Sequence, residues 1–345
     1  MVNLSTVQAS NASLPKTLFP SDGPVGVFVG ATNGIGRASL LAFAKYTQQP
    51  RLYFIGRSQT AADEVLGQLK DVNPGGQYEF IKADASLLRN VDQICQSIQA
   101  KETRLDILFQ SQGTLDFSSE TSEKLPLIMA LGYYSKMRFI ANLLPLLQRS
   151  STPRVVVVLA GTKEGPVNPN DIPGKKVKPW QARGHLCSMM TLTMERFAQS
   201  APGVSFVHSY PGFVRTSLDQ SIKGVTGVIM RSIFPIVNMF ATRNWISLEE
   251  TGDRHVFLST APRYAAKERS AGLSSEGGRV DGPQAVVASN GEIGAGVYTV
   301  DEYCESGDAS VQQVLQKLRE NRTDQKIWEH LNDVFKRATG KSSIH

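Results

Sequence analysis

Cysteine is scarce in this chain of 345 residues, which contains three. Because Cys95, Cys187 and Cys304 stand far apart, they predict neither a disulfide framework nor a metal-ligand cluster. Long apolar runs are also missing, since no stretch reaches the roughly 18 apolar residues of a membrane-spanning helix. The first twenty residues lack the basic segment and apolar core of a signal peptide. We therefore expect a cytoplasmic protein with no metal site and no membrane contact.

The net charge of +6 does not by itself indicate a nucleic-acid-binding protein. Lysine and arginine are scattered along the chain, and the richest patch, residues 174–180, lies in a Pro/Gly loop without interleaved aromatic residues. We expect no nucleic-acid partner. A modest positive surplus suits a protein that binds an anionic dinucleotide.

Short β-branched or aromatic runs alternate with longer helical patterns along the chain. The runs of strand length are residues 25–30, 51–55, 78–82, 105–110, 154–160 and 204–209, and the helical segments include 34–46, 59–72, 86–100 and 122–149. Nearly continuous apolar strands separated by helices are typical of a parallel sheet covered on both faces. The sequence predicts an α/β fold, a Rossmann-type doubly wound parallel sheet in a single domain.

The stretch VGATNGIGR follows the first predicted strand and opens the first predicted helix. Gly30, Gly34 and Gly36 have no Cβ atoms, so the turn can tighten and the main chain can approach a pyrophosphate at the helix N-terminus. Free N–H groups and the helix dipole favour negative charge there.

These glycines resemble the GxxxGxG motif of the short-chain dehydrogenase/reductase (SDR) superfamily, and the resemblance covers roughly residues 22–300. It includes Asp84 after the third strand, Gly113 in QSQG, and YPGFVRT at 210–216. Several stretches of the sequence also resemble reductase-like proteins of fungal secondary-metabolite gene clusters.

The resemblance implies a nicotinamide dinucleotide cofactor. The residues expected to bind it are Gly30, Thr32, Asn33, Gly34, Ile35, Gly36, Arg37, Arg57, Ser58, Asp84, Ala85, Ser111, Gln112, Gly113, Pro211 and Gly212. Where NAD-binding enzymes of this fold end the second strand in an acidic residue, this chain has Arg57 and Ser58. A guanidinium can pair with a 2′-phosphate that a carboxylate would repel, and Arg37 is a second cation near the loop, so we expect NADPH. Alternatively, Arg57 is a solvated loop residue.

The catalytic residues that the resemblance implies are missing. The family's tyrosine and lysine positions align with Ala182 and Leu186, its serine with Ala160 and its asparagine with Met129. Shifting the alignment by one or two residues does not restore tyrosine and lysine in PWQARGHLCSMM, residues 179–190. We therefore expect a non-standard active site in an apolar pocket.

The polar residues that remain near this position are the catalytic candidates. They are Tyr133, Tyr134, Thr162, Lys163 and His185. Each has an alternative interpretation: Lys163 can be a solvated loop residue, a lone histidine is often structural, and adjacent tyrosines on a helix cannot both face one pocket. A near-neutral histidine suits proton delivery.

Five segments describe the expected organisation. They are an N-terminal arm (1–20), the Rossmann domain (21–300), an apolar substrate lid within it (224–245), a mobile excursion (262–295) and a C-terminal helical extension (301–345). The apolar lid segment can also be an oligomer contact, which makes a homo-oligomer a further possibility, or a contact with a membrane surface.

The function expected from these features is NADPH-dependent reduction of a hydrophobic secondary metabolite. Hydride transfer to a conjugated C=C or an activated carbonyl fits a pocket without the usual proton donor. Two alternatives stay open: a non-redox isomerase or cyclase, and a catalytically inactive nucleotide-binding protein.

Overall fold

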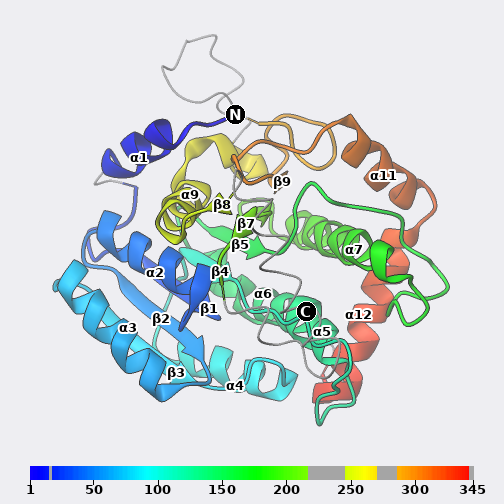
Figure 1. The fold of residues 1–345 in the computed structure, drawn as a ribbon, viewed down its shortest axis with the longest axis horizontal. Coiled ribbons are helices and arrows are strands. Elements are labelled where there is room, and N and C mark those ends of the chain that lie inside the picture. Colours follow the sequence, from blue (N-terminus) through cyan, green and yellow to red (C-terminus); the bar gives the residue numbers. More distant parts are fainter. Residues whose placement is uncertain (15–17, 217–244, 270–285, 342–345) are drawn as a thin grey trace.

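The computed structural model describes residues 1–14, 18–216, 245–269 and 286–341. Its centre is a seven-stranded parallel sheet with the order β3-β2-β1-β4-β5-β6-β9 (Figure 1). The strands are β1 (Val25–Val29), β2 (Arg51–Gly56), β3 (Gln77–Lys82), β4 (Ile107–Gln110), β5 (Arg154–Val158), β6 (Ser205–Ser209) and β9 (Val297–Val300). The doubly wound parallel sheet predicted from the sequence is confirmed.

The strand order reverses between β1 and β4. From β1 the chain winds outward to β3, then returns to β4 on the other side of β1 and winds outward to β9. Val27 of β1 is therefore in register with Tyr53 of β2 and with Leu108 of β4. In open α/β sheets, ligands bind outside the carboxyl ends of the strands at such a reversal.

Helices cover both faces of the sheet. One face carries α2 (Gly34–Tyr46), α3 (Gln59–Val72) and α9 (Leu248–Thr260), and the other carries α4 (Leu88–Gln99), α6 (Ser135–Leu147) and α7 (Pro179–Ser200) (Figure 1). Successive side chains of β1 alternate between the two cores, with Phe28 in one and Val27 and Val29 in the other. The continuous apolar run of β1 is explained by burial on both faces.

The single long helix expected over 122–149 is divided. A short α5 (Leu127–Met129) leads into a π-helical turn, η1 (Ala130–Tyr134), before α6 begins. A π-helical turn shifts the direction of the side chains that follow it, and such turns are frequent at functional sites.

The expected N-terminal arm contains a helix, α1 (Leu4–Ala12), which packs on α9. Asn11 of α1 is buried and donates from Nδ2 to the Asp253 carbonyl oxygen at 2.8 Å. The arm thereby extends the layer of α2 and α9.

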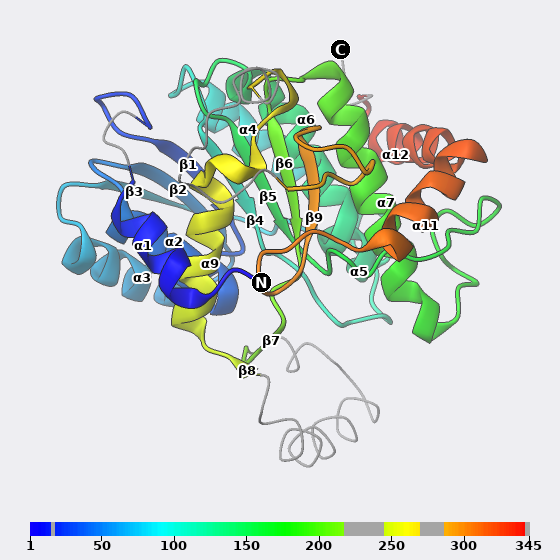
Figure 2. The same ribbon diagram turned by 90° about the horizontal axis from the view of Figure 1, so that it is seen from above.

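The expected C-terminal extension forms α11 (Ala309–Glu320) and α12 (Thr323–Thr339). Figure 2 shows both helices beside α7, on the side of the molecule far from α1. Apolar residues of α12, including Leu331 and Phe335, belong to the same core as α4, α6 and α7. Arg138 of α6 pairs with Asp92 of α4 at 2.6 Å and lies under the Phe335 ring.

The expected lid, 224–245, lies almost wholly outside the described residues. Its described border is a small two-stranded sheet of β7 (Phe213–Val214) and β8 (Trp245–Ile246). The expected mobile excursion, 262–295, is described at both ends: Arg263 in η4 (Pro262–Tyr264) pairs with Glu305 at 3.0 Å, and the Ser289 N–H donates to the Val297 carbonyl oxygen. Among the described helices, none is long and apolar enough to cross a membrane.

Candidate cofactor cleft and active site

The turn between β1 and α2 depends on residues without a side chain. Gly30 has a φ of +79°, and a Cβ on it would lie 2.7 Å from the Gln112 main-chain nitrogen. A Cβ on Gly36 would overlap the Gly30 carbonyl oxygen and Ser111 Oγ. Any larger residue would therefore push the first turn of α2 away from the sheet. Asn33 caps the helix by accepting from the Gly34 N–H at 2.7 Å.

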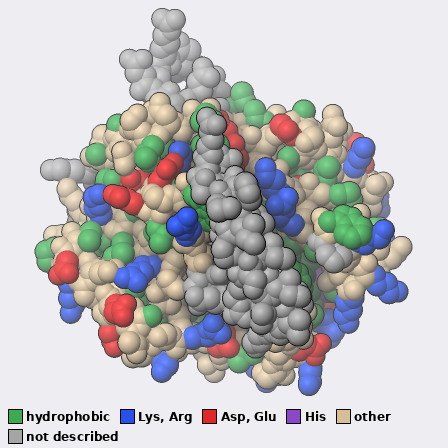
Figure 3. Space-filling view, in the orientation of Figure 1, with side chains coloured by type: hydrophobic (Ala, Val, Ile, Leu, Met, Phe, Trp, Pro, Cys, Tyr) green, Lys and Arg blue, Asp and Glu red, His purple; other side chains and the backbone are tan. Residues whose placement is uncertain are grey.

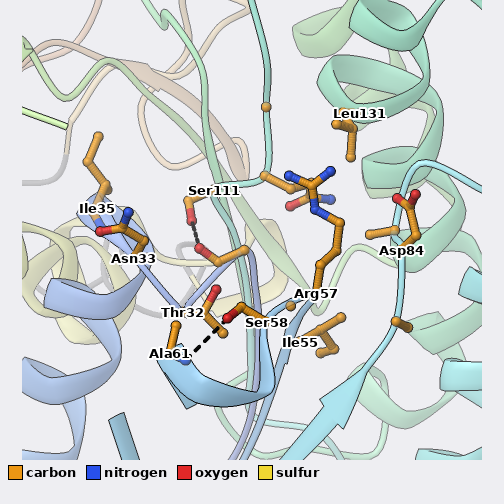
Figure 4. Close-up of a pocket in the computed structure, with 18 of the residues that line it drawn as sticks. Thr32, Asn33, Ile35, Ile55, Arg57, Ser58, Ala61, Asp84, Ser111 and Leu131 are labelled. Atoms are coloured by element: carbon orange, nitrogen blue, oxygen red, sulfur yellow. Dashed lines mark hydrogen bonds between the residues drawn. The ribbon is translucent and has the colours of Figure 1, made fainter. Parts of the chain in front are cut away.

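A cleft with a cavity volume of about 720 Å³ opens over this turn. Figure 4 shows its lining side chains, with Asn33 and Ile35 on the α2 side and Asp84 and Leu131 opposite. The predicted residues that line it are Gly30, Thr32, Asn33, Gly34, Ile35, Gly36, Arg57, Ser58, Asp84, Ala85, Ser111, Gln112 and Gly113. The structure thus gathers most of the expected cofactor site at the carboxyl ends of β1, β2, β3 and β4.

Charge is unevenly distributed along the cleft. Among the described residues that line it, Arg57 is the one cation and Asp84 the one carboxylate. Arg57 is exposed, extends into the cleft (Figure 4), and has no hydrogen bond or ion pair with the described part of the protein. Ser58 beside it caps α3 by accepting from the Ala61 N–H at 3.2 Å. The second strand therefore ends in an available guanidinium.

Arg37 does not line the cleft, contrary to our expectation of a second cation at this phosphate position. Its Nε donates to Gln68 Oε1 at 3.1 Å, and Nη1 lies 3.9 Å from Glu64 Oε2. Both partners are on α3, so Arg37 joins α2 to α3.

Pro211 and Gly212 also lie outside the lining of the cleft. Gly212 has a φ of +74°, and a Cβ on it would meet Glu302 and Ile246 at 2.9 Å. The PG turn brings the chain to Thr216, which does line the cleft and lies next to Gly34.

The residues that were missed contribute shape more than charge. They are Ile55, Gly56, Ala61, Ala83, Leu131 and Thr216. Gly56 is required because a Cβ there would collide with Thr32. Several of them could have been predicted because they are next to predicted residues in the sequence: Gly56 precedes Arg57, and Ala83 precedes Asp84. Leu131 had no such signal because the π-helical turn determines which of its neighbours face the cleft.

The cleft fits a dinucleotide on grounds of its own chemistry. Its volume lies within the usual range of small-molecule sites, roughly 300–1,000 Å³. The glycine turn leaves the first N–H groups of α2 facing outward, where an anion is stabilised. Gln112 Oε1, which lies in the lining, is a buried acceptor without a partner in the described residues. A ligand with a phosphate and a hydrogen-bond donor would satisfy both features.

Tyr133 and Tyr134 are in the core, which corrects their assignment as catalytic candidates. Tyr133 is fully buried, and its hydroxyl is 2.6 Å from Thr193 Oγ1. The Tyr134 hydroxyl is 2.8 Å from Nε2 of His330 in α12. Burial raises the pKa of Tyr134 above its usual range and lowers the pKa of His330 to about 4. Neither hydroxyl reaches the cleft.

His185 and Thr162 also hold the structure together. His185 is buried, and its Nε2 lies 2.9 Å from the Ile172 carbonyl oxygen. Because a carbonyl only accepts, Nε2 carries the proton and fixes the loop before α7. The Thr162 main-chain N–H donates to Thr299 Oγ1, while its own hydroxyl is buried without a partner in the described residues.

Lys163 is the remaining predicted candidate, and it lies in the turn after β5. Its Nζ is 5.3 Å from the centre of the Tyr210 ring, which follows β6. Burial and the nearby Glu302 raise the pKa of Tyr210. A lysine and a half-buried tyrosine thus meet at the carboxyl ends of two adjacent strands.

A buried polar network supports the turn that carries Lys163. Glu164 Oε1 accepts from the hydroxyls of Thr191 and Thr299, both at 2.7 Å, and lies 3.4 Å from His208 Nδ1. The Ala160 N–H donates to His208 Nε2 at 3.3 Å, so the proton of a neutral His208 is on Nδ1. Burial raises the pKa of Glu164, but these donors outweigh it and lower the pKa overall.

Lys136 is a further buried group that the sequence did not indicate. It projects from α6, is almost fully buried, and donates from Nζ to the Val158 carbonyl oxygen at 2.6 Å. Burial lowers its pKa to about 7. No described carboxylate pairs with it. A lysine with a pKa near neutral pH therefore lies at the carboxyl end of β5, beside α7. The helix α7 itself contains neither tyrosine nor lysine.

Comparison with known proteins bears on this arrangement. The sequence model of the short chain dehydrogenase family matches residues 25–224. The chain belongs to this family of oxidoreductases. It is 36% identical to an oxidoreductase of Emericella nidulans over 98% of this chain and 99% of that protein. It is 28% identical to a short-chain dehydrogenase/reductase of Stachybotrys chartarum, over 98% and 99% of the two chains.

Solved structures share the fold at low sequence identity. An NADPH-dependent reductase involved in bacilysin biosynthesis matches with a TM-score of 0.53 at 17% identity, covering 68% of this chain and 91% of that chain. A short chain dehydrogenase of Shigella flexneri complexed with NADP matches with a TM-score of 0.52 at 19% identity, covering 70% and 92%. The Rossmann-type architecture of the family is therefore shared.

Proposed function

We propose that this protein is an NADPH-dependent reductase of a hydrophobic small molecule. The observation that carries the proposal is the Arg57 guanidinium at the end of β2, which pairs with no residue in the described part of the chain and lies beside a glycine turn shaped for a pyrophosphate. Such a guanidinium suits a 2′-phosphate, which distinguishes NADPH from NADH. The NADP-bound and NADPH-dependent fold relatives are consistent with this cofactor.

Each part of the cleft has a proposed role in holding NADPH. The main chain from Gly30 to Gly36 binds the pyrophosphate, and Arg57 with Ser58 binds the 2′-phosphate. Asp84 and Ala85 face the adenine, and the turn Ser111–Gln112–Gly113 faces the nicotinamide together with Thr216. When bound, NADPH supplies a hydride to the substrate.

The proton comes from the Lys163–Tyr210 pair in this proposal. A carbonyl or enone that accepts a hydride develops negative charge on oxygen, and a positioned acid neutralises it. The Tyr210 hydroxyl is such an acid, and the adjacent Lys163 ammonium stabilises the phenolate that remains. Tyr133, Tyr134 and His185 cannot take this role because their side chains are buried in the core, where both hydroxyls and His185 Nε2 are hydrogen-bonded.

The substrate class follows from what α7 lacks. Without a tyrosine or lysine on α7, a simple ketone has no acid in the family's usual place. Conjugate reduction places the developing charge on an oxygen remote from the carbon that receives the hydride. We therefore favour a conjugated C=C or an activated carbonyl in an apolar metabolite. The names of two similar proteins refer to metabolites: one is an NADPH-dependent reductase involved in bacilysin biosynthesis, and the other is a daunorubicin C-13 ketoreductase of Streptomyces.

The experiment is a comparison of NADPH oxidation with matched substrates. A hydrophobic α,β-unsaturated ketone should be reduced, its saturated ketone should react far more slowly, and the Tyr210→Phe variant should lose at least tenfold in rate. Turnover of a substrate without nucleotide would instead indicate an isomerase or cyclase. NADPH binding with no turnover of any activated acceptor would indicate an inactive nucleotide-binding protein.

A further inference from the structure

A second cavity lies at the amino ends of the strands, opposite the cofactor cleft. Its volume is about 320 Å³, and its lining comes from Leu18, Phe19, Thr152, Pro153, Arg154, Gly203, Ser205, Ser259, Thr260, Pro262, Ala265, Ala266 and Arg269. Arg154 begins β5 and Ser205 begins β6, which places the cavity at the amino edge of the sheet. In Figure 2, α9 runs from the side of β8 toward this edge, where its last turn contributes Ser259 and Thr260.

A buried arginine forms part of the lining. Arg154 is more than nine-tenths buried, and its Nη1 and Nη2 donate to the carbonyl oxygens of Leu258 and Ala261 at 2.8 and 3.3 Å. These carbonyls close the C-terminus of α9, whose dipole favours a cation. One donor of the guanidinium nevertheless stays unused, because Nε is buried and has no hydrogen-bond partner in the described residues. A buried donor without a partner is unfavourable, so a ligand that accepts from Nε would stabilise this site.

Arg269 is a second cation on the same cavity. Its guanidinium has no hydrogen bond or ion pair with the described part of the chain. Burial lowers the pKa of Arg154 to about 10, and the neighbouring charge of Arg269 acts in the same direction, so the two guanidinium groups repel each other. Glu268, the nearest acidic residue in sequence, lies over Gly203 and pairs with neither arginine. An anion between the arginines would relieve this repulsion.

The rest of the lining is largely apolar and offers few donors. The hydroxyls of Ser205, Ser259 and Thr260 already donate to main-chain carbonyls at 2.6 to 2.8 Å. Phe19 and Pro262 contribute apolar surface. A ligand that fills the cavity therefore needs an apolar body as well as one anionic group, which describes a small organic carboxylate better than a free phosphate ion.

We propose that this cavity binds a small organic carboxylate, with the anionic group on Arg154 and Arg269 and the apolar body against Phe19 and Pro262. The site is separate from the cofactor cleft and does not depend on the proposed reductase activity. Its occupancy would stabilise the junction between the end of α9 and the starts of β5 and β6.

The test is calorimetric titration of the full chain with hexanoate, and with hexanol as the uncharged analogue. We expect saturable hexanoate binding and no saturable hexanol binding. Arg154→Met should raise the dissociation constant at least tenfold, and Arg269→Gln at least threefold, because each removes a charged donor. Since Arg154 also holds the end of α9, Arg269→Gln provides the measurement if Arg154→Met does not fold.

Two controls decide where hexanoate binds. Arg337→Gln removes an exposed arginine on α12, which packs on the other face of the sheet from α9, and should leave the dissociation constant unchanged. Arg57→Ala tests the cofactor cleft, and a loss of binding in that variant but not in Arg269→Gln would overturn the proposal. Equal binding of hexanol, no measurable hexanoate binding, or unchanged binding in Arg269→Gln would also overturn it. NADPH binding of the Arg269→Gln variant should match the wild type, which separates this test from that of the reductase function.

Discussion

The substitution Lys136→Met should change how the stability of this protein depends on pH. Lys136 is fully enclosed, its Nζ donates to the Val158 carbonyl oxygen, and burial lowers its pKa from 10.5 to about 7. Between pH 7 and 10.5 the unfolded chain carries a proton on this residue that the folded chain does not. The contribution of Lys136 to stability therefore rises as the pH increases through this window and is smallest below pH 7.

The size of the effect follows from the pKa difference. One pH unit within the window corresponds to about 1.4 kcal/mol. Between pH 6 and 9, the wild type should therefore gain about 2 to 3 kcal/mol relative to Lys136→Met. Other titrating groups are shared by the two proteins and cancel in the difference.

Urea unfolding at a series of pH values measures this difference, provided that refolding is shown to be reversible. Lys70→Met, at an exposed position on α3, provides the control curve. If the stability curves of the wild type and Lys136→Met run parallel from pH 6 to 9, the lowered pKa is wrong.

Three further predictions address the turn, the buried network and the core tyrosine. Gly36→Ala places a Cβ against the Gly30 carbonyl and Ser111 Oγ, so NADPH affinity measured by calorimetry should fall at least tenfold; unchanged affinity would show that the cradle is not used. Because the folded-state pKa of Glu164 is lowered, its stabilising effect is present at neutral pH and lost on acidification, and Glu164→Gln should flatten the stability curve between pH 6 and 3. If the stability of Glu164→Gln falls as steeply with acidification as that of the wild type, the lowered pKa of Glu164 is contradicted. Tyr134→Phe removes the bond to His330 and should cost about 1 kcal/mol in urea unfolding with NADPH affinity unchanged, whereas a loss of affinity would return Tyr134 to the cofactor site.

Local sequence patterns were sufficient to predict the sheet and the cofactor turn. The apolar run of β1 is buried on both faces, and the helix boundaries of α2 and α3 follow the glycine turn and the Ser58 cap directly. Arg57 was predictable because its position depends on one strand end. These features involve residues close together in the chain.

The catalytic candidates could not be predicted in the same way because they depend on tertiary contacts. The π-helical turn η1 and the packing of α12 place the Tyr134 hydroxyl on His330, nearly 200 residues away in sequence. Arg37 was misplaced because its guanidinium finds Gln68 on α3. Lys163 can approach Tyr210 only because β5 and β6 are adjacent in the sheet. The order of elements predicts that adjacency, but it does not predict where the two side chains lie.

The most direct test of the central claim is calorimetric titration of NADPH and NADH into the wild type and Arg57→Ala. A charge-assisted contact with the 2′-phosphate is worth roughly 1.5–3 kcal/mol, so Arg57→Ala should weaken NADPH by about 10- to 100-fold and NADH by less than about threefold. Equal losses for both nucleotides, or no heat from either with the wild type, would contradict the account of this cleft as an NADPH site.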